Sequence, residues 1–69
     1  MKRNEVIKHL KKAAKTAGLE YEQWEGGSHT RIRVGQTVSQ LGRNSEVPDH
    51  TARKFFDQYA SELGKGWWR

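Results

Sequence analysis

The sequence contains no cysteine, which excludes disulfide bonds, thiolate metal sites and a cysteine nucleophile. No apolar run approaches the roughly 20 residues that a membrane-spanning helix needs, and no apolar signal segment is present near the start. We therefore expect a cytoplasmic protein with no membrane partner. Histidines are few and are not clustered with carboxylates at ligand spacing, so we expect no metal and no other cofactor. They are His9, His29 and His50.

Acidic residues are outnumbered by basic ones. Lys and Arg number 13 against 8 Asp and Glu, giving a formal net charge of +5. This excess bears on the partner rather than the fold, and nucleic acid, an acidic protein and an anionic membrane surface are the candidates. The 69 residues suffice for one small domain without a separate cofactor module. We expect a folded core over residues 3–64 and a tail over residues 65–69.

Apolar residues recur at spacings of three and four over residues 4–17, which predicts an amphipathic helix. Asn4 would cap its start and Gly18 would follow its end. The opposite face of this helix is basic, and contact with an RNA backbone and plain solvation are equally good interpretations of it. The basic residues are Lys8, Lys11, Lys12 and Lys15.

Three short strands are predicted next, at residues 19–24, 28–34 and 37–41. Gly26 and Gly27 would supply the positive φ of a tight turn in the first hairpin. A second turn at residues 35–36 would complete a three-stranded antiparallel meander.

A second helix is predicted after a polar loop. Pro48 marks its start, an apolar face runs along it, and Gly64 ends it. The order of helix, three strands and helix predicts an α+β fold of two layers, with both helices on one face of the sheet. The other face of the sheet is then free to meet a partner.

The second predicted strand holds the most informative pattern. Because strand side chains alternate between two faces, His29, Arg31 and Arg33 share one face. Ile32 and Val34 occupy the other face and require a core, which turns the first three residues toward solvent. An imidazole flanked by two fixed cations suits phosphate chemistry, although an ordinary polar face is the simpler alternative.

Two segments resemble a known family. The run Glu25-Gly26-Gly27-Ser28-His29 resembles the Gly-Ser-His signature of the HicA toxins, small messenger-RNA interferases of bacterial toxin–antitoxin pairs. Residues 41–48, followed by residues 51–54, are similar to the family's segment that leads into its last helix. The resemblance covers residues from about 6 to 63, and length and element order agree with it.

The resemblance implies a fold like a double-stranded RNA-binding domain, cleavage of messenger RNA, and neutralisation by a cognate HicB-type antitoxin. By motif position it implies that His29 is catalytic and that Gly27 and Ser28 shape the turn before it. The family often has Pro-Arg-His after the third strand, where this sequence has Gly42-Arg43-Asn44. Asn44 cannot carry a proton at neutral pH, which bears on catalytic efficiency and not on binding.

These observations favour a metal-independent endoribonuclease. His29 would assist attack of a ribose 2′-OH on the adjacent phosphate, and Arg31 and Arg33 would stabilise the charge that develops there. The predicted RNA-binding residues are Gly27, Ser28, Arg31, Arg33 and the four lysines of the first helix. Two alternatives remain open: a nucleic-acid-binding module that does not cut, and a small adaptor that docks on a protein through Trp67 and Trp68.

Overall fold

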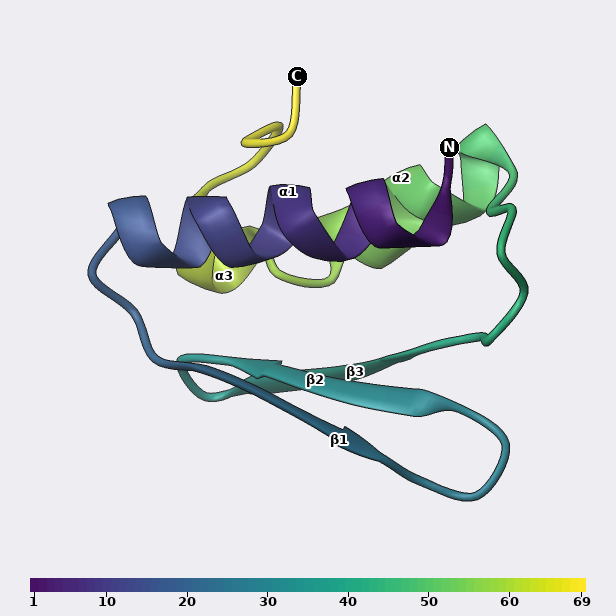
Figure 1. The fold of residues 1–69 in the computed structure, drawn as a ribbon. Helices are drawn as coiled ribbons and strands as arrows, with labels where there is room; N and C mark the ends of the chain where they lie inside the picture. Colours follow the sequence, from purple (N-terminus) through teal and green to yellow (C-terminus); the bar gives the residue numbers. More distant parts are fainter.

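The fold has two layers, with the helices covering one face of a three-stranded sheet (Figure 1). The computed structural model describes residues 1–69. In chain order the elements are α1 (Arg3–Thr16), β1 (Tyr21–Glu25), β2 (Thr30–Val34), β3 (Thr37–Leu41), α2 (Asp49–Asp57) and α3 (Ala60–Leu63). The predicted α+β class is confirmed. None of the helices combines the length and the apolar character needed to cross a bilayer.

The sheet is antiparallel throughout, with strand order β1-β2-β3. Ile32 lies opposite Gln23 of β1 and Ser39 of β3, on the face covered by the helices. Ile32 and Val34 are fully buried, whereas Arg31, directly before Ile32, is exposed and Arg33, between the two, is partly exposed. The predicted assignment of the two faces of β2 is therefore confirmed.

The β1–β2 hairpin differs from the prediction. Glu25 pairs with Thr30, so the four residues 26–29 form the loop in place of the predicted tight turn at Gly26 and Gly27. Neither Gly26 nor Gly27 has a positive φ. The Gly26 N–H donates a hydrogen bond to the His29 carbonyl at 2.9 Å, which closes the loop. His29 consequently lies at the end of the loop, directly before β2 and not within it.

The β2–β3 hairpin and the end of α1 follow the predictions. Gly35 has a φ of 60° and Gln36 has no positive φ, which is the pattern of a type II′ turn. Gly18 has a φ of 71° and follows the C-cap of α1. The Leu19 N–H bonds to the Ala14 carbonyl at 2.9 Å, which is the Schellman closure of a helix.

The start of α1 is not capped by Asn4. The helix begins one residue earlier than Asn4, and the N-cap residue, Lys2, makes no side-chain capping bond. The chain before the helix pairs instead with the segment before α2. The Val47 N–H donates to the Met1 carbonyl at 2.8 Å, and the Arg3 N–H donates to the Ser45 carbonyl at 2.9 Å. Hydrogen bonds to a segment distant in the sequence therefore hold the start of α1, in place of the expected side-chain cap.

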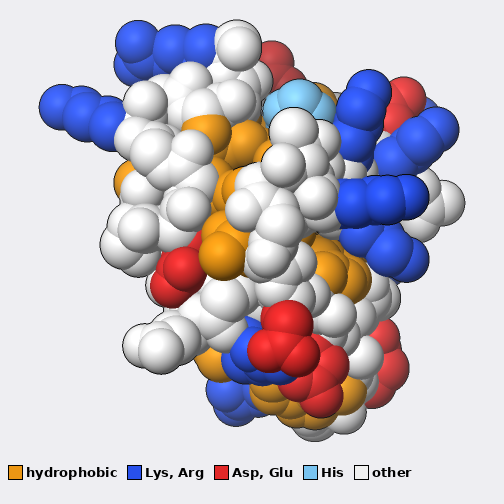
Figure 2. Space-filling model, turned by 90° about the vertical axis from the view of Figure 1, so that its left-hand side faces the viewer, with side chains coloured by type: hydrophobic (Ala, Val, Ile, Leu, Met, Phe, Trp, Pro, Cys, Tyr) orange, Lys and Arg blue, Asp and Glu red, His pale blue; other side chains and the backbone are white.

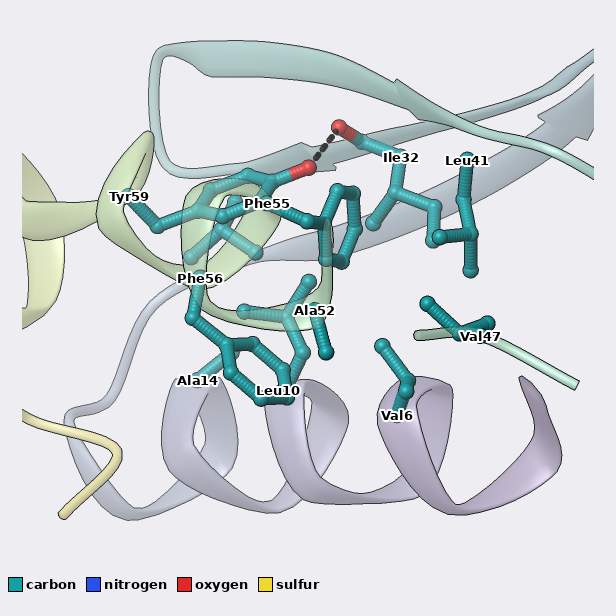
Figure 3. Close-up of a cluster of buried hydrophobic side chains, with 11 residues drawn as sticks. Val6, Leu10, Ala14, Ile32, Leu41, Val47, Ala52, Phe55, Phe56 and Tyr59 are labelled. Carbon is teal, nitrogen blue, oxygen red and sulfur yellow. Dashed lines mark hydrogen bonds between the residues drawn. The ribbon is translucent and has the colours of Figure 1, made fainter. Parts of the chain in front are cut away.

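The second predicted helix is divided into α2 and α3. At the division, the Gln58 and Tyr59 N–H groups bond to carbonyls three residues back rather than four. This tighter turn brings Tyr59 into the core, where it is fully buried and its hydroxyl donates to the Ile32 carbonyl at 2.8 Å (Figure 3). Burial raises the pKa of the Tyr59 phenol.

The core lies between the two layers, and both contribute to it (Figure 3). Its largest fully buried side chain is Tyr59. The eleven buried hydrophobic residues are Val6, Leu10, Ala14, Ile32, Val34, Leu41, Val47, Ala52, Phe55, Phe56 and Tyr59.

The tail packs on the side of the helical layer away from the sheet (Figure 1). Trp67 Nε1 donates to the Phe56 carbonyl at 2.9 Å, and Trp68 Nε1 donates to Asp57 Oδ1 at 2.7 Å. Both indoles are partly buried. A positive φ of 72° at Gly66 turns the tail, which is neither helix nor strand, and adjacent tryptophans can therefore face the same surface.

Candidate functional site

The sheet face opposite the helices, called here the outer sheet face, carries the residues singled out from the sequence. The register aligns its side chains in two rows across the three strands. The row nearer the β1–β2 loop is Trp24, Arg31 and Gln40, and the row farther from it is Glu22, Arg33 and Val38.

Arg31 extends from β2 along the β1–β2 loop. A Cβ added to Gly26 would lie 3.2 Å from Arg31 Nε and 3.6 Å from Arg31 Cδ, so the side chain occupies the space that the glycine leaves. The neighbouring Arg33 and Arg43 form ion pairs with glutamates, whereas Arg31 forms none. The Arg31 guanidinium is therefore an unpaired cation beside the loop that carries His29.

His29 and Arg31 line the same open groove at the β3 edge of the sheet, called here the His29 groove. The backbone carbonyl of His29 accepts the bond that closes the loop, whereas its side chain is exposed. An imidazole and an unpaired guanidinium that line one groove can together hold an anion and transfer a proton to or from it. The remaining lining residues are Val38, Ser39, Gln40, Gly42, Thr51 and Gln58, of which only Val38 is hydrophobic.

Arg33 does not join this groove. Its Nη2 lies 2.7 Å from Glu22 Oε1, its Nε lies 3.0 Å from the same oxygen, and its Nη1 donates to the Gly35 carbonyl. The hydrogen bond to Glu22 raises the pKa of Arg33. Arg33 lies two residues, roughly 7 Å, along β2 from Arg31, and its contacts direct it toward the β2–β3 turn. The predicted row of three is therefore divided, with His29 and Arg31 together and Arg33 apart.

A polar cluster braces the base of the β1–β2 loop. Thr30 is the only buried polar residue, and its hydroxyl is bonded to Glu25 at 2.9 Å and to the Arg3 guanidinium. Arg43 Nε lies 3.0 Å from Glu25 Oε1, and Arg43 Nη2 donates to the Gly26 carbonyl at 2.6 Å. Arg3 and Arg43 thus tie the loop to α1 and to the segment after β3, and sequence reasoning assigned neither of them a role.

The lysines of α1 form a separate basic surface. Lys8, Lys11, Lys12 and Lys15 are all exposed and recur at helical spacing along one stripe. Figure 2 shows a group of Lys and Arg side chains at its right edge, with others at the upper left and at the bottom. The stripe lies in the helical layer, and none of the four lysines lines the His29 groove.

The loop residues Gly27 and Ser28 are exposed, and a Cβ added to Gly27 would meet no atom within 4 Å. Of the two glycines, only Gly26 is in a position where a side chain would be crowded. The reason is the nearby Arg31 and His29 atoms, since neither glycine has a positive φ.

Sequence reasoning also assigned no role to Trp24 of β1. The indole is 41% exposed on the outer sheet face, directly opposite Arg31. Strand alternation offered a usable signal, because Trp24 is three residues from Tyr21, which packs against the core, and therefore lies on the opposite face of β1.

No group of three or more His, Cys, Asp or Glu side chains is arranged to hold a metal ion. Comparison of the sequence with protein-family models gave no match. Comparisons with curated proteins and with solved structures also gave no match.

Proposed function

We propose that this protein is an endoribonuclease of the HicA toxin type that cleaves messenger RNA with His29 as its catalytic residue. The observation that carries the proposal is the placement of an exposed His29 and an unpaired Arg31 in one open groove. The two-layer order α1-β1-β2-β3-α2 supports the further proposal of a fold like a double-stranded RNA-binding domain.

The proposed reaction needs one proton acceptor and one fixed cation. The neutral imidazole of His29 takes the proton of a ribose 2′-OH, the 2′ oxygen attacks the adjacent phosphorus, and the bond from phosphorus to the 5′ oxygen breaks. The leaving 5′ oxygen takes a proton from water or from the imidazolium. Arg31 stabilises the charge on the phosphorane oxygens during this step.

The other predicted residues have supporting roles in this proposal. Arg33 forms an ion pair with Glu22, which keeps the Glu22 carboxylate away from Arg31. The lysine stripe of α1 provides backbone contacts for RNA outside the groove, where each neutralised phosphate adds affinity that salt weakens. The proposed partners are messenger RNA and a cognate HicB-type antitoxin.

A non-catalytic RNA-binding module is the second candidate, because the lysine stripe favours it without any need for His29. The protein-docking adaptor loses its main support. Its proposed contact residues, Trp67 and Trp68, each donate a hydrogen bond within the chain and pack against Phe56.

The chemistry of the cleavage products tests the proposal. Purified protein is expected to cut single-stranded RNA in the presence of EDTA, leaving 2′,3′-cyclic phosphate and 5′-hydroxyl ends, because the attacking group is the neighbouring 2′-OH. Mass spectrometry of the fragments identifies the ends, and the matching DNA oligonucleotide is the control that cannot react. Binding of RNA without cleavage would establish the second candidate, and 3′-hydroxyl products would contradict the mechanism.

A second expected result concerns Gly26. An alanine there meets Arg31 Nε at 3.2 Å and the His29 carbonyl oxygen at 3.3 Å, so the flexible Arg31 side chain is displaced while the fold persists. A misplacement of about 1 Å can cost on the order of 10²-fold in rate, and Gly26→Ala is expected to lose cleavage on that scale. Gly27→Ala places its methyl group in open space and is expected to lose less. Cleavage rates of the two variants, with melting temperatures as the folding control, make the comparison. Equal losses would show that Arg31 does not depend on this space.

A further inference from the structure

Trp24 lies exposed on β1, an edge strand of the sheet. Its relative exposure is 41%, and the other large hydrophobic residue exposed on the sheet is Val38 at 46%. The two other tryptophans pack against Phe56. The outer sheet face therefore presents one aromatic ring that the fold does not cover.

The neighbours of Trp24 give this ring a chemical context. Arg31 is directly opposite Trp24, and Gln40 is directly opposite Arg31, so the three side chains cross the sheet in one row. On the loop side of this row, Gly26 contributes no side chain, and its N–H bonds to the His29 carbonyl. Trp24 and His29 are thus diagonal neighbours across the hairpin, a relation that corresponds to roughly 7 to 8 Å between backbones. The only side chain that lies over the glycine between them is that of Arg31.

We propose that the Trp24–Arg31–Gln40 row is a binding subsite for single-stranded RNA, in which one base stacks on Trp24 and the phosphate beside it contacts Arg31. This inference rests on the proposed function and specifies which form of RNA the site takes. The phosphate held by Arg31 lies on the side of the groove where His29 is placed. Bases inside a duplex are already covered by their neighbours, so a stacking platform of this kind selects unpaired nucleotides.

The polarity of the surface favours RNA over a protein partner. Arg31 and Arg33 of β2 lie between the two exposed apolar side chains, Trp24 of β1 and Val38 of β3, and a single hydrophobic residue lines the adjoining groove. A protein interface of ordinary stability has a well-packed, desolvated centre. A nucleotide has a base that can stack on the indole of Trp24 and an anionic phosphate that can pair with the guanidinium of Arg31.

Binding of a non-cleavable RNA tests the subsite separately from catalysis. The probe is a fluorescein-labelled 2′-O-methyl oligoribonucleotide, which lacks the attacking 2′-OH, and its affinity for the full-length protein is followed by fluorescence anisotropy. Trp24→Ala is expected to weaken binding of the single strand by about five- to hundredfold, the usual range for loss of one stacked base. Trp24→Phe retains most of the affinity and Trp24→Leu loses it, because phenylalanine preserves an aromatic face and leucine only the apolar surface.

Two further arms keep the test independent of how well the variants fold. An oligonucleotide of abasic nucleotides is expected to bind wild-type protein as weakly as the intact oligonucleotide binds Trp24→Ala. The abasic oligonucleotide should also bind wild type and Trp24→Ala with equal affinity. The same RNA annealed to its complement should be insensitive to Trp24→Ala. Equal affinity of wild type and Trp24→Ala for the single strand overturns the proposal, as does equal retention by leucine and phenylalanine. Loss of a concentration-dependent dimer in Trp24→Ala, with RNA affinity intact, would assign the surface to a protein contact instead. None of these results depends on whether His29 cleaves RNA.

Discussion

Replacement of His29 by alanine is expected to lower the rate of RNA cleavage by roughly 10² to 10⁴-fold, the usual contribution of a general acid–base group. His29 is exposed at the end of the β1–β2 loop, so truncation of its side chain opens no cavity. The bond that closes the loop uses its backbone carbonyl and survives the change. Single-turnover cleavage of a labelled RNA gives the rate, and thermal unfolding verifies the fold.

The matched control for this variant is His50→Ala. His50 is also exposed, but it lies in the first turn of α2 and does not line the His29 groove. Expression in growing cells adds a second measurement, since wild type and His50→Ala should arrest growth and His29→Ala should not. Arrest and cleavage at wild-type levels in His29→Ala would remove the catalytic assignment and leave RNA binding as the function.

Replacement of Ile32 by alanine is expected to lower the free energy of unfolding by about 2 to 5 kcal/mol, the range for truncation of a large buried aliphatic residue. Ile32 is fully buried at the centre of β2, and its backbone carbonyl accepts the Tyr59 hydroxyl. For a domain of this size such a loss is a large fraction of the total stability. Urea denaturation followed by circular dichroism measures it.

Arg31→Ala is the counterpart on the opposite face of the same strand. Arg31 is exposed and takes part in no ion pair, so its truncation is expected to change the free energy of unfolding by no more than about 0.5 kcal/mol. The same substitution should weaken RNA binding and reduce its dependence on salt. A tolerant Ile32 together with a destabilising Arg31 would mean that the two faces of β2 are reversed, and the His29 groove could not then be formed as described.

Local sequence patterns were sufficient for several elements. Alternation in β2 separated the buried Ile32 and Val34 from the exposed Arg31, because neighbouring strand residues necessarily face opposite ways. Gly18 and Gly35 were identified as turn residues, and each has the positive φ that glycine adopts without a steric penalty. In such cases the preference lies within a few consecutive residues, and the rest of the protein does not have to be known.

The candidate site depended on one quantity that those patterns did not contain, the length of the β1–β2 loop. A two-residue turn at residues 26–27 would place Glu22 opposite Arg31, whereas the observed four-residue loop places Glu22 opposite Arg33 and Trp24 opposite Arg31. A shift of two residues keeps every side chain on its face, so the prediction of the faces did not depend on the register. The loop length does decide which β1 residue lies opposite each arginine, however, and the observed register leaves Arg31 without a carboxylate partner.

The sequence by itself determined the order of the elements, the two faces of β2 and the basic excess, because these depend on residue type and short-range spacing. Only the tertiary structure decided the loop register, the division of the helix at Tyr59 and the packing of the tail. Arg43 joins Glu25 and Gly26 to the segment after β3, the Tyr59 hydroxyl bonds to β2, and Trp67 bonds to the end of α2. Each of these contacts links residues more than ten positions apart, so the free energy that selects the conformation arises only once the two layers have come together.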